Sequence, residues 1–249
     1  MKKTLLASAL ALALISTTAV ASETYFFYQH SYATENRFHG DEFGLLHDEG
    51  DVWFKIKIHL YGKNKDVAFD ESVSNSYSFY TGYHFRLTDT LMLSSSLQGR
   101  FYSGGTSGEG TVGEMGDTQQ SGARYTPGVM LRWQVAEPVS VYAQYRYDYR
   151  KIARGRVTDG EARNRHRHRY EVGASYALLE TLHLGYKAFY YQADYVLSNN
   201  KKLDYQQDVD IDWQFTPAWQ LNLGAEDIAK SATTRGREAR LKAGFTYTF

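Results

Sequence analysis

The 249-residue sequence contains no cysteine and only three prolines. An exported chain without thiols avoids oxidative mispairing, and the absence also excludes a disulfide framework and a thiolate metal site. Pro127, Pro138 and Pro217 all lie at or beside expected connections, as a sheet that cannot spare backbone donors requires. The formal net charge is zero, so bulk charge indicates no partner.

Long apolar runs are scarce as well, and the one near the start has the features of a leader. Lys2 and Lys3 precede an apolar run from residue 5 to 15, and Ala19-Val20-Ala21 offers a small-residue cleavage site. We therefore expect a signal peptide over residues 1–21 and a single mature domain over residues 22–249. The alternative, a membrane anchor, is less favoured because the run is shorter than the roughly 20 residues that span a bilayer.

Alternating apolar and polar residues fill the rest of the chain, which has a mean hydropathy of −0.51 and 15% aromatic residues. Between residues 51 and 61 the apolar phase is Val52, Phe54, Ile56, Ile58 and Leu60. Such alternation keeps average hydropathy low while one face suits lipid, and abundant aromatic residues suit interfacial girdles. We expect twelve strands, over residues 23–32, 41–47, 51–61, 76–86, 91–102, 125–135, 139–150, 163–178, 182–191, 208–215, 219–228 and 238–249.

The connections alternate in length, which predicts the topology. Short turns are expected at 47–50, 88–90, 136–138, 179–181 and 216–218, whereas the longest links cover 62–72, 103–124, 151–162 and 192–207. Short turns at one end and long loops at the other are typical of an outer-membrane barrel with periplasmic turns. The sequence thus predicts an all-β, transmembrane, antiparallel, up-and-down barrel in the outer membrane of a Gram-negative bacterium, with both termini periplasmic.

The last strand supports this prediction. Leu241, Ala243, Phe245, Tyr247 and Phe249 form an apolar phase that ends on phenylalanine. That pattern resembles the signal by which barrels are recognised, so we expect the barrel-assembly machinery as a partner through the strand that ends at Phe249. Outer-membrane lipid and lipopolysaccharide are expected around the wall, and nucleic acid is not.

Charged residues fix which face is inward, because a lysine or arginine facing lipid at mid-membrane costs about 2–4 kcal/mol. Five strand-centre cations facing lipid would cost roughly 10–20 kcal/mol, which matches or exceeds the stability of a typical domain. The predicted pore-lining cations are therefore Lys55, Lys57, Arg100, Arg132, Arg146, Arg150, Arg163, Arg165, Arg167, Arg169, Lys187, Arg240 and Lys242.

Carboxylates occur on the same predicted face: Asp148, Glu171, Asp208, Asp210, Asp212, Glu226 and Glu238. The Asp208–Asp212 ladder would temper the basic wall, and a calcium site there is disfavoured because the segment lacks a tight glycine-containing loop. His166 and His168 alternate with the arginines, face outward, and fit contact with anionic headgroups better than metal binding. No metal or cofactor is expected.

The chain resembles the oligogalacturonate-specific porin family of the KdgM and NanC type over its whole mature length. The resemblance is most specific at residues 145–151 (YRYDYRK), 168–176 (HRYEVGASY) and 233–249. It implies a monomeric twelve-stranded barrel, passive diffusion, and basic tracks that conduct acidic sugars, with Arg146, Arg150, Arg169, Arg240 and Lys242 as the positions carried over. Thr126 and Met130 depart from the pattern, since relatives tend to be more basic there, and so does the aspartate ladder.

Three functions stay open on the sequence. The favoured one is a non-enzymatic porin for oligogalacturonate or related uronates, with sialic acid or oligoalginate as alternative sugars. The second is an outer-membrane lipid hydrolase, although Ser175 is out of phase with His166 and His168. The third is a closed structural or adhesive barrel, in which lumen arginines satisfy lumen acids or the glycine-rich loop at 103–124 plugs the interior.

Overall fold

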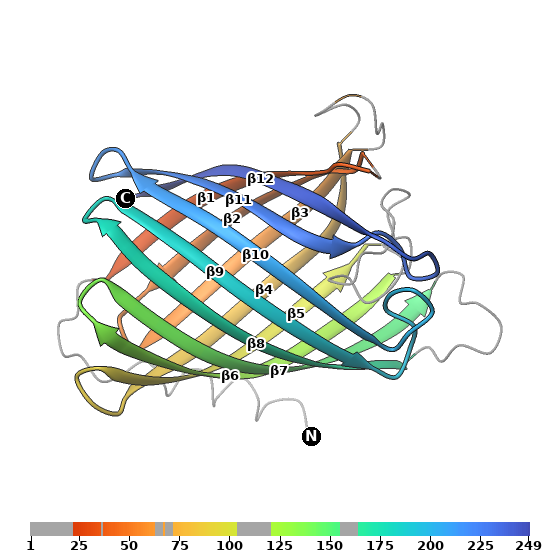
Figure 1. The fold of residues 1–249 in the computed structure, drawn as a ribbon, viewed down its shortest axis with the longest axis horizontal. Helices are drawn as coiled ribbons and strands as arrows, with labels where there is room; N and C mark the ends of the chain where they lie inside the picture. The colour runs from red at the N-terminus through yellow and green to blue at the C-terminus, as the bar shows by residue number, and fades with distance from the viewer. Residues whose placement is uncertain (1–21, 36, 63–66, 68–71, 104–120, 155–163) are drawn as a thin grey trace, which may run out of the picture.

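The computed structural model describes residues 22–35, 37–62, 67, 72–103, 121–154 and 164–249. Twelve antiparallel strands close into one barrel (Figure 1), each paired with its neighbour in the chain and the first paired with the last. The strands are β1 Glu23–Ala33, β2 His39–Asp48, β3 Val52–Gly62, β4 Ser72–Arg86, β5 Leu91–Tyr102, β6 Ser121–Ala136, β7 Val139–Arg154, β8 Asn164–Leu179, β9 Leu182–Ala193, β10 Leu203–Gln214, β11 Trp219–Ala229 and β12 Arg237–Thr248. The predicted fold class and strand number are confirmed. Within the described part of the chain, no helix is long and apolar enough to cross a membrane.

The largest difference from the prediction lies at β10, which begins at Leu203 and not at residue 208. The expected bounds of the connection, 192–207, are therefore wrong: β9 runs on to Ala193, and the link covers only residues 194–202. Leu203 and Tyr205 are exposed while Asp204 and Gln206 are buried, so the alternation continues through this segment. The inward side chains at the start of β10 are polar, and Gln207 makes the outward set partly polar as well. The alternation of apolar and polar residues is therefore weak there, and the sequence did not predict where the strand begins.

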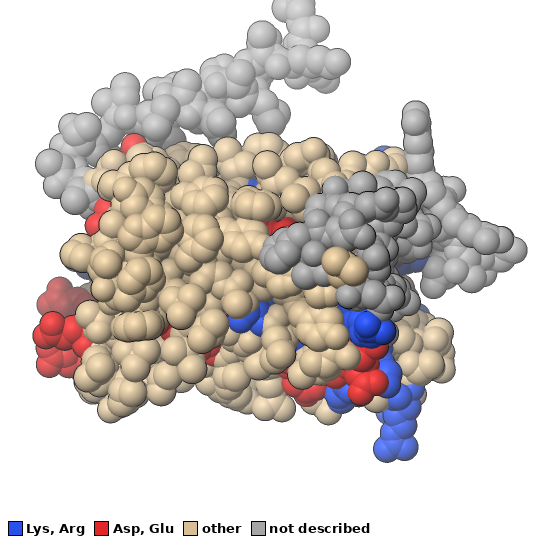
Figure 2. Space-filling model, turned by 90° about the horizontal axis from the view of Figure 1, so that it is seen from above, with Lys and Arg blue, Asp and Glu red and all other residues tan. Residues whose placement is uncertain are grey.

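The wall is apolar on the outside and charged on the inside. Phe54, Ile56 and Ile58 on β3 are 40%, 47% and 39% exposed, whereas the intervening Lys55 and Lys57 are partly buried. Figure 2 shows one side of the wall, where uncharged residues cover most of the middle and charged side chains gather toward the ends. The largest fully buried side chains include Arg150, Arg167 and Asp148, so the interior of this barrel is held by polar contacts.

The two ends of the barrel differ in the length of their connections. Because successive strands are antiparallel, the links after β2, β4, β6, β8 and β10 lie at one end, together with the start of β1 and the end of β12. The C-terminus marks that short-turn end in Figure 1. The other links lie at the opposite, long-connection end. Residues 104–120, the main part of the predicted plug loop, and residues 1–21, the expected signal peptide, lie outside the described residues.

The barrel closes between β1 and β12. Tyr25 faces Thr248 and Ala33 faces Arg240 along this seam. Beyond the strands, the Glu35 amide donates to the Glu238 carboxylate at 3.0 Å. The seam is thus continuous in backbone pairing and joins residues about two hundred positions apart in sequence.

Gly44 on β2 occupies a crowded point of the inner wall. A Cβ there would lie 2.1 Å from Phe27 Cζ and 2.5 Å from the Ile56 carbonyl oxygen. We expect Gly44→Ala to lower the free energy of unfolding by about 1–3 kcal/mol, as overpacked sites do, in a urea titration of the refolded barrel in detergent. Gly99→Ala is the control, because its Cβ would meet nothing closer than Phe101 at 3.4 Å. Equal free energies of unfolding for the two variants would contradict the crowding described around Gly44.

Candidate functional site in the barrel interior

The predicted charged residues that the structure describes lie on the side of the wall opposite the exposed apolar residues. They are Lys55, Lys57, Arg100, Arg132, Arg146, Arg150, Arg165, Arg167, Arg169, Lys187, Arg240 and Lys242, with Asp148, Glu171, Asp208, Asp210, Asp212, Glu226 and Glu238. Arg163 lies outside the described residues. Most are buried or partly buried; Arg132 is exposed, with its Cζ 5.8 Å from the Tyr142 ring centroid. That any of them lines a conducting path stays a prediction.

Strand register assembles four arginines into a row that the sequence did not reveal. Arg100 faces Arg124, Arg124 faces Arg150, and Arg150 faces Arg165, across β5 to β8. All four are buried. The Arg150 guanidinium lies 3.9 Å from the Tyr102 ring centroid, close enough for a cation–π contact. Arg124 was missed because residues 121–124 were expected to be loop; it stands two positions before Thr126, in the same inward phase.

The side chain of Arg167 is fully engaged in contacts within the barrel wall. Its Nε and Nη2 atoms donate to Asp148 Oδ2 at 2.9 and 2.6 Å, and Thr126 Oγ1 donates to Asp148 Oδ1 at 2.6 Å. The guanidinium also lies 4.9 Å from the Tyr191 ring centroid, and the Arg167 side chain is fully buried. Arg167, the middle one of the described β8 arginines 165, 167 and 169, is thus part of the packed wall. Next to this cluster, burial raises the pKa of Tyr195, which follows β9, to about 12.

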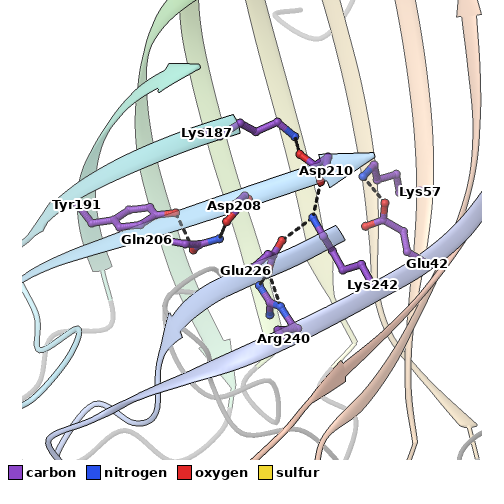
Figure 3. Close-up of polar contacts among 10 residues, drawn as sticks. All are labelled: Glu42, Lys57, Lys187, Tyr191, Gln206, Asp208, Asp210, Glu226, Arg240 and Lys242. Carbon is purple, nitrogen blue, oxygen red and sulfur yellow. Dashed lines mark hydrogen bonds and ion pairs between the residues drawn. The ribbon is translucent and has the colours of Figure 1, made fainter. Parts of the chain in front are cut away.

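The aspartate ladder is embedded in a network of basic residues, drawn in Figure 3. Asp210 accepts ion pairs from Lys187 at 2.6 Å and from Lys242 at 3.3 Å. Lys242 also reaches Glu226 at 2.9 Å, and Arg240 pairs with the same carboxylate. The carboxylates of β10 and β11 therefore neutralise the cations of β9 and β12 that stand beside them.

The other two ladder members bond to amides. Gln206 donates from Nε2 to Asp208 at 2.8 Å and accepts from the Tyr191 hydroxyl at 3.2 Å (Figure 3). Asn222 donates to Asp212 at 2.7 Å. Each carboxylate of the ladder has a protein partner, and nowhere among the described residues do three or more His, Asp or Glu side chains form a potential metal site. The ladder is a structural network in the wall.

Three cavities in the interior are lined by described residues. They have volumes of about 290, 420 and 440 Å³, and Lys57 lines all three. Lys57 is paired with Glu42, whose other oxygen lies 3.2 Å from His59 Nδ1. Lys55 lines the two larger cavities. These cavities, which charged and apolar side chains line together, meet at Lys57 of β3.

Lys55 and Arg146 differ from the paired cations. Among the described residues, no carboxylate lies within ion-pair distance of either, and Lys55 Nζ sits 4.4 Å from the Phe27 ring centroid. Arg146 Nε is buried without a hydrogen-bond partner, and Arg146 directly faces Arg169 of β8, whose Nε is in the same state. Both Lys55 and Arg146 line the cavity of about 420 Å³. Three cations, Lys55, Lys57 and Arg146, and one carboxylate, Asp48, are among the residues that line this cavity, so these groups give its lining a net positive charge.

His166 and His168 of β8 lie on the outer face, as their phase predicts. The hydroxyl of Tyr147 contacts His166 Nδ1, and that of Tyr145 contacts His168 Nδ1 at 2.8 Å. Rings from the two strands pack at centroid distances between 5.1 and 6.1 Å. The histidines thus belong to an aromatic surface on β7 and β8.

The sequence from residue 18 to residue 249 matches the family model described as "Oligogalacturonate-specific porin protein (KdgM)". The chain belongs to this family. Among solved structures it is similar to the NanC porin, with a TM-score of 0.69 at 14% identity over 89% of this chain and 98% of that one. It is also similar to the KdgM porin, with a TM-score of 0.63 at 12% identity over 90% and 99%. No curated protein matches the sequence.

Family and fold together make the chain an outer-membrane porin, which confirms the predicted family, membrane and class of protein. They favour a channel over the outer-membrane hydrolase that the sequence left open. The short-turn end, where β1 begins and β12 ends, is the end expected in the periplasm, and this orientation stays a prediction.

Proposed function

We propose that this porin conducts acidic oligosaccharides of the uronate class across the outer membrane by passive diffusion. The observation that carries the proposal is the pair Lys55 and Arg146, two interior cations that share a cavity and form no ion pair with a carboxylate of the described residues. Arginine donates two parallel hydrogen bonds to a carboxylate, and a lysine is a compact positive charge. A chain of uronates can therefore offer one carboxylate to each.

Continuity of the interior supports a path. The cavities that contain Lys55 and Arg146 on one side and Lys187 and Lys242 on the other share Lys55 and Lys57. A polyanion entering at the long-connection end would pass its carboxylates between Arg146 and Lys55, and the low-dielectric walls would focus the positive potential that attracts it. The family model and the NanC and KdgM structures, which are named as porins, agree with such a role.

The cations paired within the wall act differently in this proposal. Arg167, Arg240 and Lys242 already have carboxylate partners, so they hold the shape of the interior and add little net charge. Anion preference then depends on few residues, which explains how a chain of zero formal net charge can select anions. The barrel is expected to work as a monomer inserted through its C-terminal strand.

Planar-bilayer recording of the refolded protein tests the proposal. In a KCl gradient the reversal potential should indicate anion preference, and oligogalacturonate should produce concentration-dependent current interruptions. A neutral oligosaccharide of equal length should leave the current unchanged, because it has no carboxylates to bind. Sialic acid and oligoalginate in the same panel decide between the acidic sugars. Cation preference with no response to any acidic sugar would overturn the proposed function.

A further inference from the structure

A groove opens on the outer wall at the long-connection end of the barrel. Tyr190, Leu203 and Tyr205 expose 46%, 45% and 52% of their surface there, on β9 and β10. Lys201 and Arg235, both exposed, stand at its edge. The groove has a volume of about 500 Å³. We call this feature, bounded by these five residues, the outer groove; it lies on the opposite face of the wall from the interior cavities.

The edge of the outer groove is held by a tight hairpin. Asn199 and Asn200 adopt left-handed backbone conformations, with φ of 48° and 57°, and Ser198 bridges to Lys201. The Asn200 amide donates to the Ala232 carbonyl at 2.8 Å, which ties the hairpin to the segment that follows β11. Two separate connections thus hold their cations over one space, as a preformed site requires.

Beneath the edge, Arg237 fixes the floor. Its Nε donates to Asp227 and its Nη1 to Asp204, both at 2.9 Å, and its guanidinium lies 4.2 Å from the Tyr205 ring centroid. The two carboxylates are therefore engaged by Arg237. Lys201 and Arg235 have no carboxylate within ion-pair distance among the described residues, so the edge of the groove presents net positive charge.

The aromatic surroundings place the groove at the membrane interface. Tyr190 lies three residues before the end of β9, Tyr205 is the third residue of β10, and both rings are exposed on the outer wall. Exposed tyrosines near the strand ends of a membrane barrel mark the level of the lipid headgroups. The outer groove begins at these two tyrosines and has its cations on the connections beyond them.

We propose that the outer groove binds a phosphorylated, acylated glycolipid of the lipid A type. Its phosphate would lie between Lys201 and Arg235, where charge-assisted hydrogen bonds are strong. The proximal parts of its acyl chains would cover Leu203 and the rings of Tyr190 and Tyr205. A lipid is the fitting occupant because the floor of the groove is apolar surface on the lipid-facing wall, which a small soluble anion would leave uncovered. This inference does not depend on the substrate proposed for the channel.

Native mass spectrometry of the full barrel released from detergent, titrated with lipid A, tests the assignment. Lys201→Glu combined with Arg235→Glu should raise the Kd of the tightest lipid A binding at least about tenfold. The loss of one hydrogen bond to a charged group already changes an affinity by about that factor. Removing the phosphates from lipid A should weaken binding to the wild type to a similar degree. Inorganic phosphate should not compete at equal concentration.

Lys151→Glu is the matched control, because Lys151 is an exposed cation at the same end of the barrel, on β7, and does not line the groove. It should bind lipid A as the wild type does. Single-channel conductance of all variants reports that the barrel has folded. Unchanged lipid A affinity in the double variant, equal binding of the dephosphorylated lipid, or full displacement by inorganic phosphate would each overturn the site.

Discussion

Replacing both Lys55 and Arg146 by glutamate is expected to convert the pore from anion preference to cation preference. Two positive charges become two negative ones in a single cavity of about 420 Å³. Unit charges a few ångströms apart interact by about 1 kcal/mol in water and by about 4 kcal/mol near a protein surface. We therefore expect the ratio of potassium to chloride permeability to rise at least about tenfold, measured from the reversal potential in a KCl gradient.

Two comparisons make this result specific to the cavity. The effect should shrink as salt is raised, because screening shortens the reach of each charge. Lys151→Glu adds the same kind of charge reversal on the outer face of β7 and should leave the reversal potential unchanged. If Lys151→Glu moved it as far as the interior variant did, overall charge and not the cavity would control selectivity.

Replacing Asp148 by alanine should produce the largest loss of stability. Asp148 is 1% exposed and is the carboxylate partner of the fully buried Arg167 guanidinium. Removing one partner of a buried pair leaves a charge without compensation, which typically costs about 3–5 kcal/mol. A urea titration of the refolded barrel in detergent should show a drop of that order in the free energy of unfolding.

A second variant separates charge imbalance from lost packing. Replacing Asp148 by alanine and Arg167 by leucine together removes both charges, so the double variant should recover much of the lost stability. Asp89→Ala, in the exposed turn between β4 and β5, should have little effect. A double variant less stable than Asp148→Ala would show that the pair stabilises the barrel in its own right.

Much of the fold follows from the sequence because each strand has its own alternation. In the apolar phase of β3, Phe54, Ile56 and Ile58 are exposed while Val52 and Leu60 at its ends are half-buried, and the boundaries of β5 are identical to the prediction. The start of β10 at Leu203 was missed because its inward side chains there are polar and Gln207 interrupts the apolar outward phase. Local pattern fails where both faces of a strand carry polar residues.

The sequence predicted which charged residues share the inner face of the wall, but not which of them form ion pairs. Sequence phase placed Arg167 and Asp148 on one face, yet only the register of β7 against β8 brings them directly opposite each other. Register likewise sets Asp208 opposite Lys187 on β9. Which cations keep their charge available therefore depends on contacts between strands, and single-strand patterns contain no information about them.

The seam between β1 and β12 has a consequence for how the barrel is made. β1 is synthesised first, and the backbone donors and acceptors on its outer edge pair only with β12, up to the contact of the Phe249 amide with the Thr24 carbonyl at 3.0 Å. An open strand edge is a template for wrong pairing. The unpaired edge of β1 must therefore be protected from pairing with other chains until β12 has been synthesised. A truncated copy that lacks β12 would keep that edge permanently open.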